Sequence, residues 1–354
     1  MADQLTREAV LEREKRLAGP TAIAGYISAL LLIAGVIVHL KVPQKSNASD
    51  QLLQFSAHHQ ALLASGFLVA AGLLFAIAPL TYLFRAAAAR NPRVRPTLIA
   101  FCIIGPLLFG VQTIVASDAL KTAGDSFTAR KGSEQPQNVK VLQNAISSDP
   151  SSLSKVTLYN TDGKQNAGEV EKTDGTFYSV TFPAKSEVAL KNSLDKASVD
   201  TSEDSSGKIG DAYANHLALD SNGYKLAGNL ALPAGVMMIF GVVYPALQAF
   251  RVGLITRLLS TLGALAAASL ILLPLAPAFI GMWLAWLCLI YLDRVPKGRS
   301  RAWDAGMAVP WPRPGQQPTP EAPIEGTAQE LDPDAPAPNP PRQRGERRKR
   351  KSRG

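Results

Sequence analysis

Six long apolar runs dominate the sequence, and each is close to the ~20 residues that an α-helix needs to cross the hydrocarbon core of a bilayer. A segment inside lipid must pair its own backbone N–H and C=O groups, so we expect each run to be a helix. The runs cover residues 20–40, 61–84, 97–117, 229–250, 253–273 and 276–292. The sequence therefore predicts an α-helical polytopic membrane protein with six transmembrane helices.

Lys and Arg residues are divided unevenly between alternate loops, and this division predicts the orientation, because short cytoplasmic loops carry the excess of positive charge. Four lie in residues 1–19, four in 85–96 and two in 251–257, and the C-terminal tail is densely basic. The loop at 41–60 carries two and the loop around 274–277 none. We therefore expect both termini in the cytoplasm, and a multi-pass location in a cell membrane such as a bacterial inner membrane.

The same pattern divides the 354 residues into five parts. They are a cytoplasmic N-terminal segment (1–19), helices 1–3 (20–117), an extracytoplasmic domain (118–227), helices 4–6 (228–293) and a cytoplasmic tail (294–354). The tail between 297 and 341 is rich in Pro, Ala and Gln, a composition that cannot bury a core, so we expect it to be disordered.

The insert between helices 3 and 4 has the signals of a small α+β domain. Apolar residues at helical spacing predict helices at 139–146 and 186–197, and alternation predicts strands at 155–160, 167–172, 176–182 and 198–201. Asp174-Gly175 is the strongest hairpin signal in the chain. The predicted order is α-β-β-β-α-β.

Residues Val141–Asp204 resemble the extracytoplasmic domain of membrane-anchored AAA+ zinc proteases of the FtsH type. The shared pattern is a short helix, the strand KVTL, a G-x-V strand, a DG turn, an aromatic strand ending in Pro, and then a helix and a strand. The resemblance implies a domain fold and a role in assembly or in contact with partner membrane proteins. The chain has neither a G-x-x-x-x-G-K-[ST] phosphate loop nor an H-E-x-x-H zinc motif, so no catalytic residue is carried over.

Aromatic residues of the insert have two interpretations. They form either the core of the α+β domain or part of a face that contacts a partner protein. The residues concerned are Tyr159, Phe177, Tyr178 and Phe182.

The C-terminal thirteen residues carry eight Lys and Arg against one acid, and they supply +7 of the overall +9 charge. The basic side chains are Arg342, Arg344, Arg347, Arg348, Lys349, Arg350, Lys351 and Arg353. Anionic lipid headgroups attract such clusters, so we expect contact with the inner leaflet; the alternative is a tail that serves topology and solubility. The positive charge belongs to this tail, so nucleic acid is not a predicted partner.

The histidines, cysteines and acidic residues of the sequence form no recognisable motif for catalysis or for binding a metal or a cofactor. The four histidines, His39, His58, His59 and His216, have no Cys or paired acid at ligand spacing. Cys102 and Cys288 fall inside apolar runs, where we expect small buried hydrophobes. Ionisable residues, which mark ion and proton paths, are missing from the middle of the spans.

These observations predict a non-enzymatic integral membrane protein that presents an extracytoplasmic protein-interaction or assembly domain. One alternative is a transport or channel component that works as an oligomer, because single copies have few polar positions to line a path. A membrane enzyme is a third class, with His39, His58 and the loop that follows the first span as its only candidates.

Overall fold

The computed structural model describes residues 7–131, 137–159, 165–204, 208–220, 222–272, 275–295 and 298–311. The predicted disorder of the tail, residues 297–341, is wrong for residues 298–311, which contain the helix Arg301–Ala305 and the side chain of Trp303, buried against Tyr82 and Tyr291. Residues 312–354, with the eight basic side chains, lie outside the described residues. The helices are α1 (Arg7–His39), α2 (Ala48–Ala57), α3 (His59–Arg90), α4 (Ile99–Lys131), α5 (Val139–Ser148), α6 (Glu187–Lys196), α7 (Asp211–Asp220), α8 (Asn222–Arg251), α9 (Arg257–Leu272), α10 (Ala276–Tyr291) and α11 (Arg301–Ala305). The strands are β1 (Gln137–Asn138), β2 (Leu153–Tyr159), β3 (Gln165–Lys172), β4 (Phe177–Pro183) and β5 (Asp200–Asp204).

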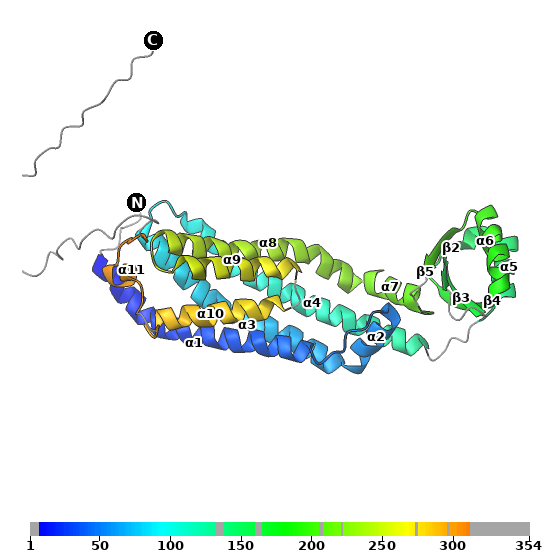
Figure 1. Ribbon diagram of the computed structural model, residues 1–354, viewed down its shortest axis with the longest axis horizontal. Coiled ribbons are helices and arrows are strands. Elements are labelled where there is room, and N and C mark those ends of the chain that lie inside the picture. Colours follow the sequence, from blue (N-terminus) through cyan, green and yellow to red (C-terminus); the bar gives the residue numbers. More distant parts are fainter. Residues whose placement is uncertain are drawn as a thin grey trace, which may run out of the picture. The chain divides into compact units, whose positions relative to one another are not determined.

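Four helices, α1, α3, α4 and α8, are long and apolar enough to cross a membrane. They have 30 to 33 residues each and lie side by side (Figure 1). Helix α4 continues past its apolar part as a polar helix that ends at Lys131. These four helices correspond to predicted spans 1 to 4.

The fifth and sixth predicted spans form shorter helices. Both α9 and α10 contain 16 residues, or about 24 Å of helix at 1.5 Å per residue, against a hydrocarbon core of about 30 Å. The indole Nε1 of Trp283 on α10 donates a hydrogen bond to the Leu259 carbonyl of α9 (2.9 Å). Gly263 of α9 makes room for the same indole, which a Cβ at that position would meet at 2.6 Å.

Small residues bring the long helices into close contact. A Cβ on Gly105 of α4 would lie 2.7 Å from the Met237 carbonyl oxygen of α8, and one on Gly241 of α8 would lie 2.5 Å from the Phe101 carbonyl oxygen. The Ser28 hydroxyl of α1 donates to the Gly72 carbonyl of α3 (2.7 Å). Helices in lipid associate through such close packing and interhelical hydrogen bonds.

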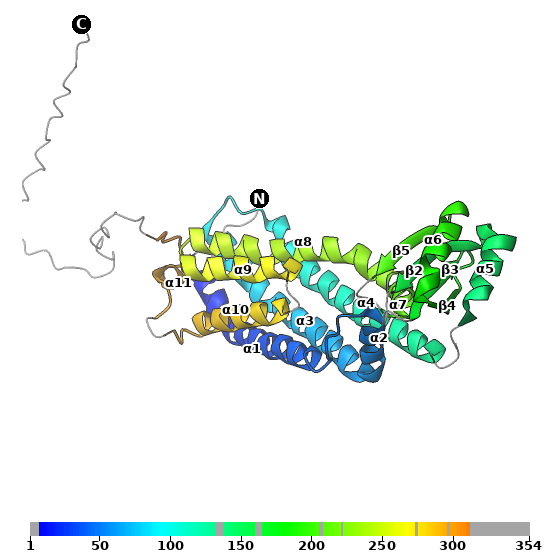
Figure 2. The same cartoon turned by 45° about the vertical axis from the view of Figure 1, so that its right-hand side comes forward.

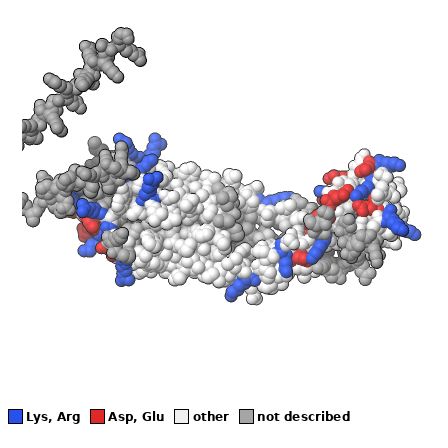
Figure 3. All heavy atoms as spheres, in the orientation of Figure 1, with Lys and Arg blue, Asp and Glu red and all other residues white. Residues whose placement is uncertain are grey.

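Contacts between loops place alternate connections at opposite ends of the bundle. At one end, which we call the basic end, Arg90 donates to the Ala302 carbonyl and the Trp303 indole donates to the Leu254 carbonyl. At the other end, the Ser49 amide donates to Asp211. Figure 3 shows charged side chains at both ends and an uncharged surface between them. Alternate connections at opposite ends are what the predicted orientation requires.

Between α4 and α7 lies a five-stranded sheet with the order β1-β4-β3-β2-β5. The β2–β3 and β3–β4 pairs are antiparallel, and β1–β4 and β2–β5 are parallel. One face of the sheet packs on α5 and α6 (Figures 1 and 2), where Leu142, Val156, Val180, Phe182 and Leu194 form the core.

Predicted and observed elements of this domain agree in order, and the structure adds β1 at one edge. The hairpin at Asp174-Gly175 forms as expected: Gly175 adopts a φ of 79°, and the Asp174 carboxylate accepts from the Thr176 amide (2.8 Å). Two helices were not anticipated, α2 in the loop after α1 and α7 before α8. Both lie at the end of the bundle where the sheet domain is attached.

Candidate functional site

The open face of the sheet, opposite α5 and α6, carries a buried carboxylate. Glu169 of β3 pairs in register with Thr157 of β2 and Ser179 of β4, and only 4% of its surface is exposed. An acid at such a depth needs several hydrogen-bond donors, because burial removes its hydration.

The donors come from a helix more than forty residues further along the chain. Glu169 accepts hydrogen bonds from the backbone amides of Ala212 (3.0 Å) and Tyr213 (3.2 Å) in the first turn of α7, and from that of Gly210 (3.1 Å), which directly precedes the helix. Helix N-termini leave such amides unpaired and carry partial positive charge. The carboxylate of a β-strand therefore caps a helix that leads into the membrane bundle.

The Tyr159 hydroxyl completes this arrangement. It donates to Glu169 (2.8 Å) and accepts from the Ala212 amide (3.0 Å). Burial raises the pKa of Glu169, and the hydrogen bonds from Tyr159 and α7 oppose that rise. Burial and the neighbouring Glu169 carboxylate raise the pKa of Tyr159 as well. We call Tyr159, Glu169 and the first turn of α7 the sheet–helix junction.

Asp211, the first residue of α7, extends the junction to α2. It accepts from the Ser49 amide (2.8 Å), from the Lys208 amide (2.6 Å) and from the Asn47 side chain (3.3 Å). Burial would raise the pKa of Asp211, but the hydrogen bonds from Ser49, Lys208 and Asn47 outweigh it and hold the pKa below its ordinary value. Glu169 thus caps the N-terminus of α7, and Asp211 caps the N-terminus of α2.

Aromatic rings fill the space beside these carboxylates. The ring of Phe177 on β4 lies 5.2 Å from Tyr213 and 4.8 Å from His216, both on α7. Tyr213 in turn lies 6.0 Å from Phe127 near the end of α4. Rings at these separations pack favourably, so the sheet contacts the bundle through apolar as well as polar groups.

The structure buries all four aromatic residues that the sequence offered as core or partner contact. Tyr178 and Phe182 lie in the core under α5 and α6, whereas Tyr159 and Phe177 face the junction. Their burial places them inside this chain. That a partner also contacts them remains a prediction.

Histidines and cysteines do not gather into a site. Within the described ranges, no group of three or more His, Cys, Asp or Glu residues is arranged to hold a metal ion. His58 and His59 each lie within hydrogen-bond distance of a nearby backbone carbonyl of α2. Both cysteines are buried, as expected from their apolar surroundings.

A second unusual feature lies at the basic end, where Glu14 of α1 and Arg90 of α3 form a buried ion pair. The two guanidinium Nη atoms contact the two carboxylate oxygens at 2.5 and 2.9 Å. Arg90 also donates to the carbonyls of Ala86 and Ala302, each at 3.0 Å. All three guanidinium nitrogens are therefore used, which compensates for the removal of this charge from water.

The segment after α10 packs on this ion pair. Trp303 lies with its ring 5.5 Å from the Arg90 guanidinium and stacks on Tyr82 at 5.9 Å. The Trp311 indole and the Val309 amide donate to the Ile255 and Val252 carbonyls. Residues 298–311 are thereby held against the ends of α3 and α8.

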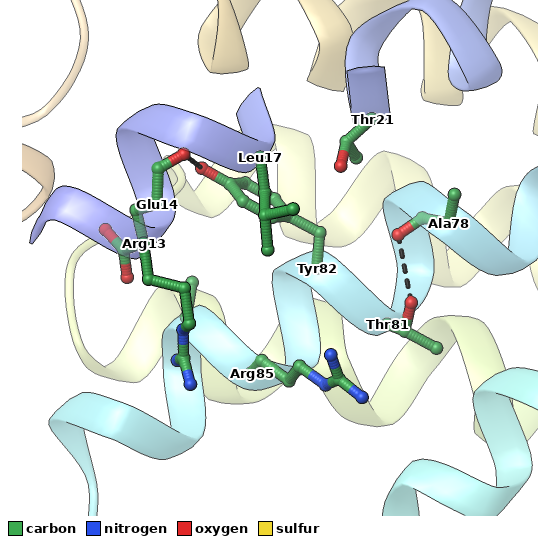
Figure 4. Close-up of a pocket in the computed structure, with 9 residues that line it drawn as sticks. Arg13, Glu14, Leu17, Thr21, Ala78, Thr81, Tyr82 and Arg85 are labelled. Atoms are coloured by element: carbon green, nitrogen blue, oxygen red, sulfur yellow. Dashed lines mark hydrogen bonds between the residues drawn. The ribbon is translucent and has the colours of Figure 1, made fainter. Parts of the chain in front are cut away.

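Next to the ion pair lies a groove between α1 and α3, with a volume of about 180 Å³. Arg13, Leu17 and Thr21 line it from α1, and Thr81 and Arg85 from α3 (Figure 4).

The sequence interpretation missed three buried acids, Glu14, Glu169 and Asp211. Glu169 stands in a predicted strand among Lys and Glu residues, and Glu14 stands in a charged stretch, so composition marks neither. The sequence around Glu169 gives no clear sign of its burial, because β3 has polar residues on both faces: Glu169 and Glu171 lie on one, and Asn166 and Lys172 on the other. A local sequence pattern cannot show that a residue far along the chain, such as Arg90 for Glu14, will be its hydrogen-bond partner.

Comparisons with known proteins found no match among protein-family models, curated proteins or solved structures. Function must be inferred from the geometry of this chain.

Proposed function

We propose that this chain is a non-enzymatic membrane protein that presents its sheet domain outside the cell membrane for contact with other proteins. In this proposal α9 and α10 complete six spans, both termini are cytoplasmic, and the domain resembling that of FtsH-type proteases serves assembly. The observation that carries the proposal is the sheet–helix junction.

The junction uses its polar groups for attachment. Each oxygen of Glu169 accepts from α7, and Asp211 is occupied by the start of α2. Carboxylates that perform acid–base chemistry must reach a substrate proton. Here they join the sheet to helices that enter the membrane, which suits a domain held out for recognition.

Hydroxyl groups of the spans are used in the same way. Ser28 donates to the carbonyl of Gly72, and Ser260 of α9 donates to the carbonyl of Ala246 on α8 (3.2 Å). These bonds join helices. They therefore favour the interpretation of the spans as a packed bundle, and they count against a polar transport path.

The outer surfaces of α5 and α6 are the part of the domain best suited to a partner. Val141 of α5 is 45% exposed and Val188 of α6 is 68% exposed. The edge strand β5 carries Asp200, Glu203 and Asp204, and charges on an edge oppose pairing with another strand. We therefore place the partner contact on α5 and α6.

Photo-crosslinking in intact cells tests this proposal. A crosslinking residue in place of Val188 or Val141 should give the same protein adduct reproducibly, whereas one in place of Asp174, on the hairpin of the same domain, should not. Recovery of the chain alone from all three positions would contradict the interaction function.

The basic tail has a separate test. We propose that Arg342–Arg353 rests on anionic lipid, in which case the tail should bind anionic vesicles and leave them at high salt. Binding that ignores salt, or no binding, would contradict this.

A further inference from the structure

We propose that the groove between α1 and α3 binds the phosphate headgroup of an anionic membrane lipid, held by Arg13 and Arg85. This site is distinct from the basic tail and is independent of what the sheet domain contacts. It is argued from the charges that line the groove and from the helix surface that leads away from it.

The two arginines have no acidic partner of their own among the described residues. In the parts of the chain that the structure describes, neither Arg13 nor Arg85 forms an ion pair. Glu14, the acid in the groove lining, is already neutralised by Arg90 at 2.5 and 2.9 Å. The groove therefore carries two uncompensated positive charges.

Polar and apolar groups are arranged around these charges in a way that fits a headgroup. In Figure 4 the Arg13 side chain reaches from α1 toward α3, and the Arg85 side chain runs below Thr81 with its guanidinium group directed away from Arg13, so in this proposal the flexible Arg85 side chain turns toward Arg13 when the phosphate binds. The Thr81 hydroxyl donates to the carbonyls of Ile77 and Ala78, so it is used within its own helix. Guanidinium groups bind phosphate oxygens through paired N–H donors, which suits a phosphate at this place.

The surface of α3 beyond the groove is apolar and exposed, as an acyl chain requires. Phe67, Leu74, Ala78 and Arg85 follow at intervals of seven, four and seven residues, which places them on one helix face. Phe67 and Leu74 are more than half exposed. Leu74 lies about 16 Å from Arg85 along the helix at 1.5 Å per residue, close to the ~15 Å depth of one leaflet.

These features favour a lipid over a free anion. A free phosphate would use only the two guanidinium groups, whereas the exposed stripe on α3, like the exposed apolar surface of the other long helices, would lie against acyl chains. Leu17, also exposed, lies in the groove lining and adds apolar surface beside the charges.

The test compares two double variants of the full chain that lose the same charge. Arg13→Gln with Arg85→Gln empties the groove of cations, and Arg93→Gln with Arg95→Gln removes two exposed cations from the neighbouring loop. Each protein is delipidated in neutral detergent and titrated with phosphatidylglycerol, phosphatidylcholine or inorganic phosphate, with bound lipid counted by native mass spectrometry. Thermal unfolding shows that each variant is folded, and Arg13→Lys with Arg85→Lys replaces the Gln pair if that pair fails to fold.

The proposal expects one phosphatidylglycerol to bind the wild type and the loop variant equally, and the groove variant roughly tenfold or more weakly, since each cation near anionic lipid contributes about 1 kcal/mol. With the Lys pair, the loss of paired donors should still weaken binding. Equal losses in both double variants would overturn the site. Equal binding of phosphatidylcholine, or displacement of the lipid by millimolar phosphate, would overturn the assignment to an anionic lipid.

Discussion

Glu14 and Arg90 show how a charged pair can be stable at the end of an apolar bundle. Removing two charges from water is costly, and a buried pair is stable only when its remaining donors and acceptors are also satisfied. Arg90 meets this condition through the Ala86 and Ala302 carbonyls and the Trp303 ring.

Replacing one partner of this pair should be far more harmful than replacing both. Arg90→Met leaves Glu14 buried without a counter-charge and should cost about 3–5 kcal/mol of unfolding free energy, whereas Glu14→Met with Arg90→Met should recover most of it. Thermal unfolding of the purified protein in detergent measures both, with Arg93→Met in the exposed loop as a control. A double variant as unstable as the single one would contradict this account.

Asp211 should make the attachment of α2 sensitive to acid. Its pKa is lowered in the folded chain, so its contribution is complete above the ordinary aspartate pKa of about 3.9 and is lost as the pH falls through the lower folded value. Asp211→Asn should therefore lower the unfolding temperature at pH 7, by an amount equivalent to about 1–2 kcal/mol. The difference in unfolding temperature between wild type and Asp211→Asn should be smaller at pH 3.

The exposed Asp195 provides the control, because Asp195→Asn should have the same unfolding temperature as wild type, within error, at pH 3 and at pH 7. A gap between wild type and Asp211→Asn that is the same at pH 3 and pH 7 would show that the charge of Asp211 is not what stabilises α2.

Among the elements, α7 depends most on a group far away in sequence. Glu169→Ala leaves the amides of Gly210 and Tyr213 without their acceptor and leaves the Ala212 amide only the Tyr159 hydroxyl, and hydrogen bonds to charged groups contribute about 1.5–3 kcal/mol each. Hydrogen exchange of residues 210–220 should become about tenfold faster or more, which mass spectrometry can follow.

Glu171 is the matched control, since it lies two residues along on the same face of β3 and is only half-buried. Glu171→Ala should leave exchange in α7 unchanged. Equal acceleration by both substitutions would mean that Glu169 has no special role in the junction.

The elements also show where sequence reasoning succeeds. Alternation and the Asp174-Gly175 turn are local signals, so the succession of helices and strands along the chain was predictable, and long apolar runs gave α1, α3, α4 and α8. Helices α2 and α7 were missed because their N-termini are capped by Asp211 and Glu169, which no local pattern reveals. The groove at Arg13 and Arg85 was missed for the same reason: it forms only when α1 and α3 pack.

At the scale of the whole molecule, the chain alternates between two charged ends. The basic end collects the start of α1, the loop after α3, the start of α9 and residues 298–311, and the opposite end carries α2, α7 and the sheet domain. Within each end, buried polar contacts join the segments to one another. The bundle can therefore bring its two ends to opposite faces of a membrane.

Labelling with a membrane-impermeant thiol reagent tests this arrangement most directly. Cys102 and Cys288 are buried, so single cysteines introduced as Asp174→Cys in the sheet domain and Arg93→Cys at the basic end report their own sides. We predict that Asp174→Cys reacts in intact cells and that Arg93→Cys reacts only after permeabilisation. Reaction of both without permeabilisation, or of Arg93→Cys alone, would contradict the membrane-crossing arrangement proposed for this protein.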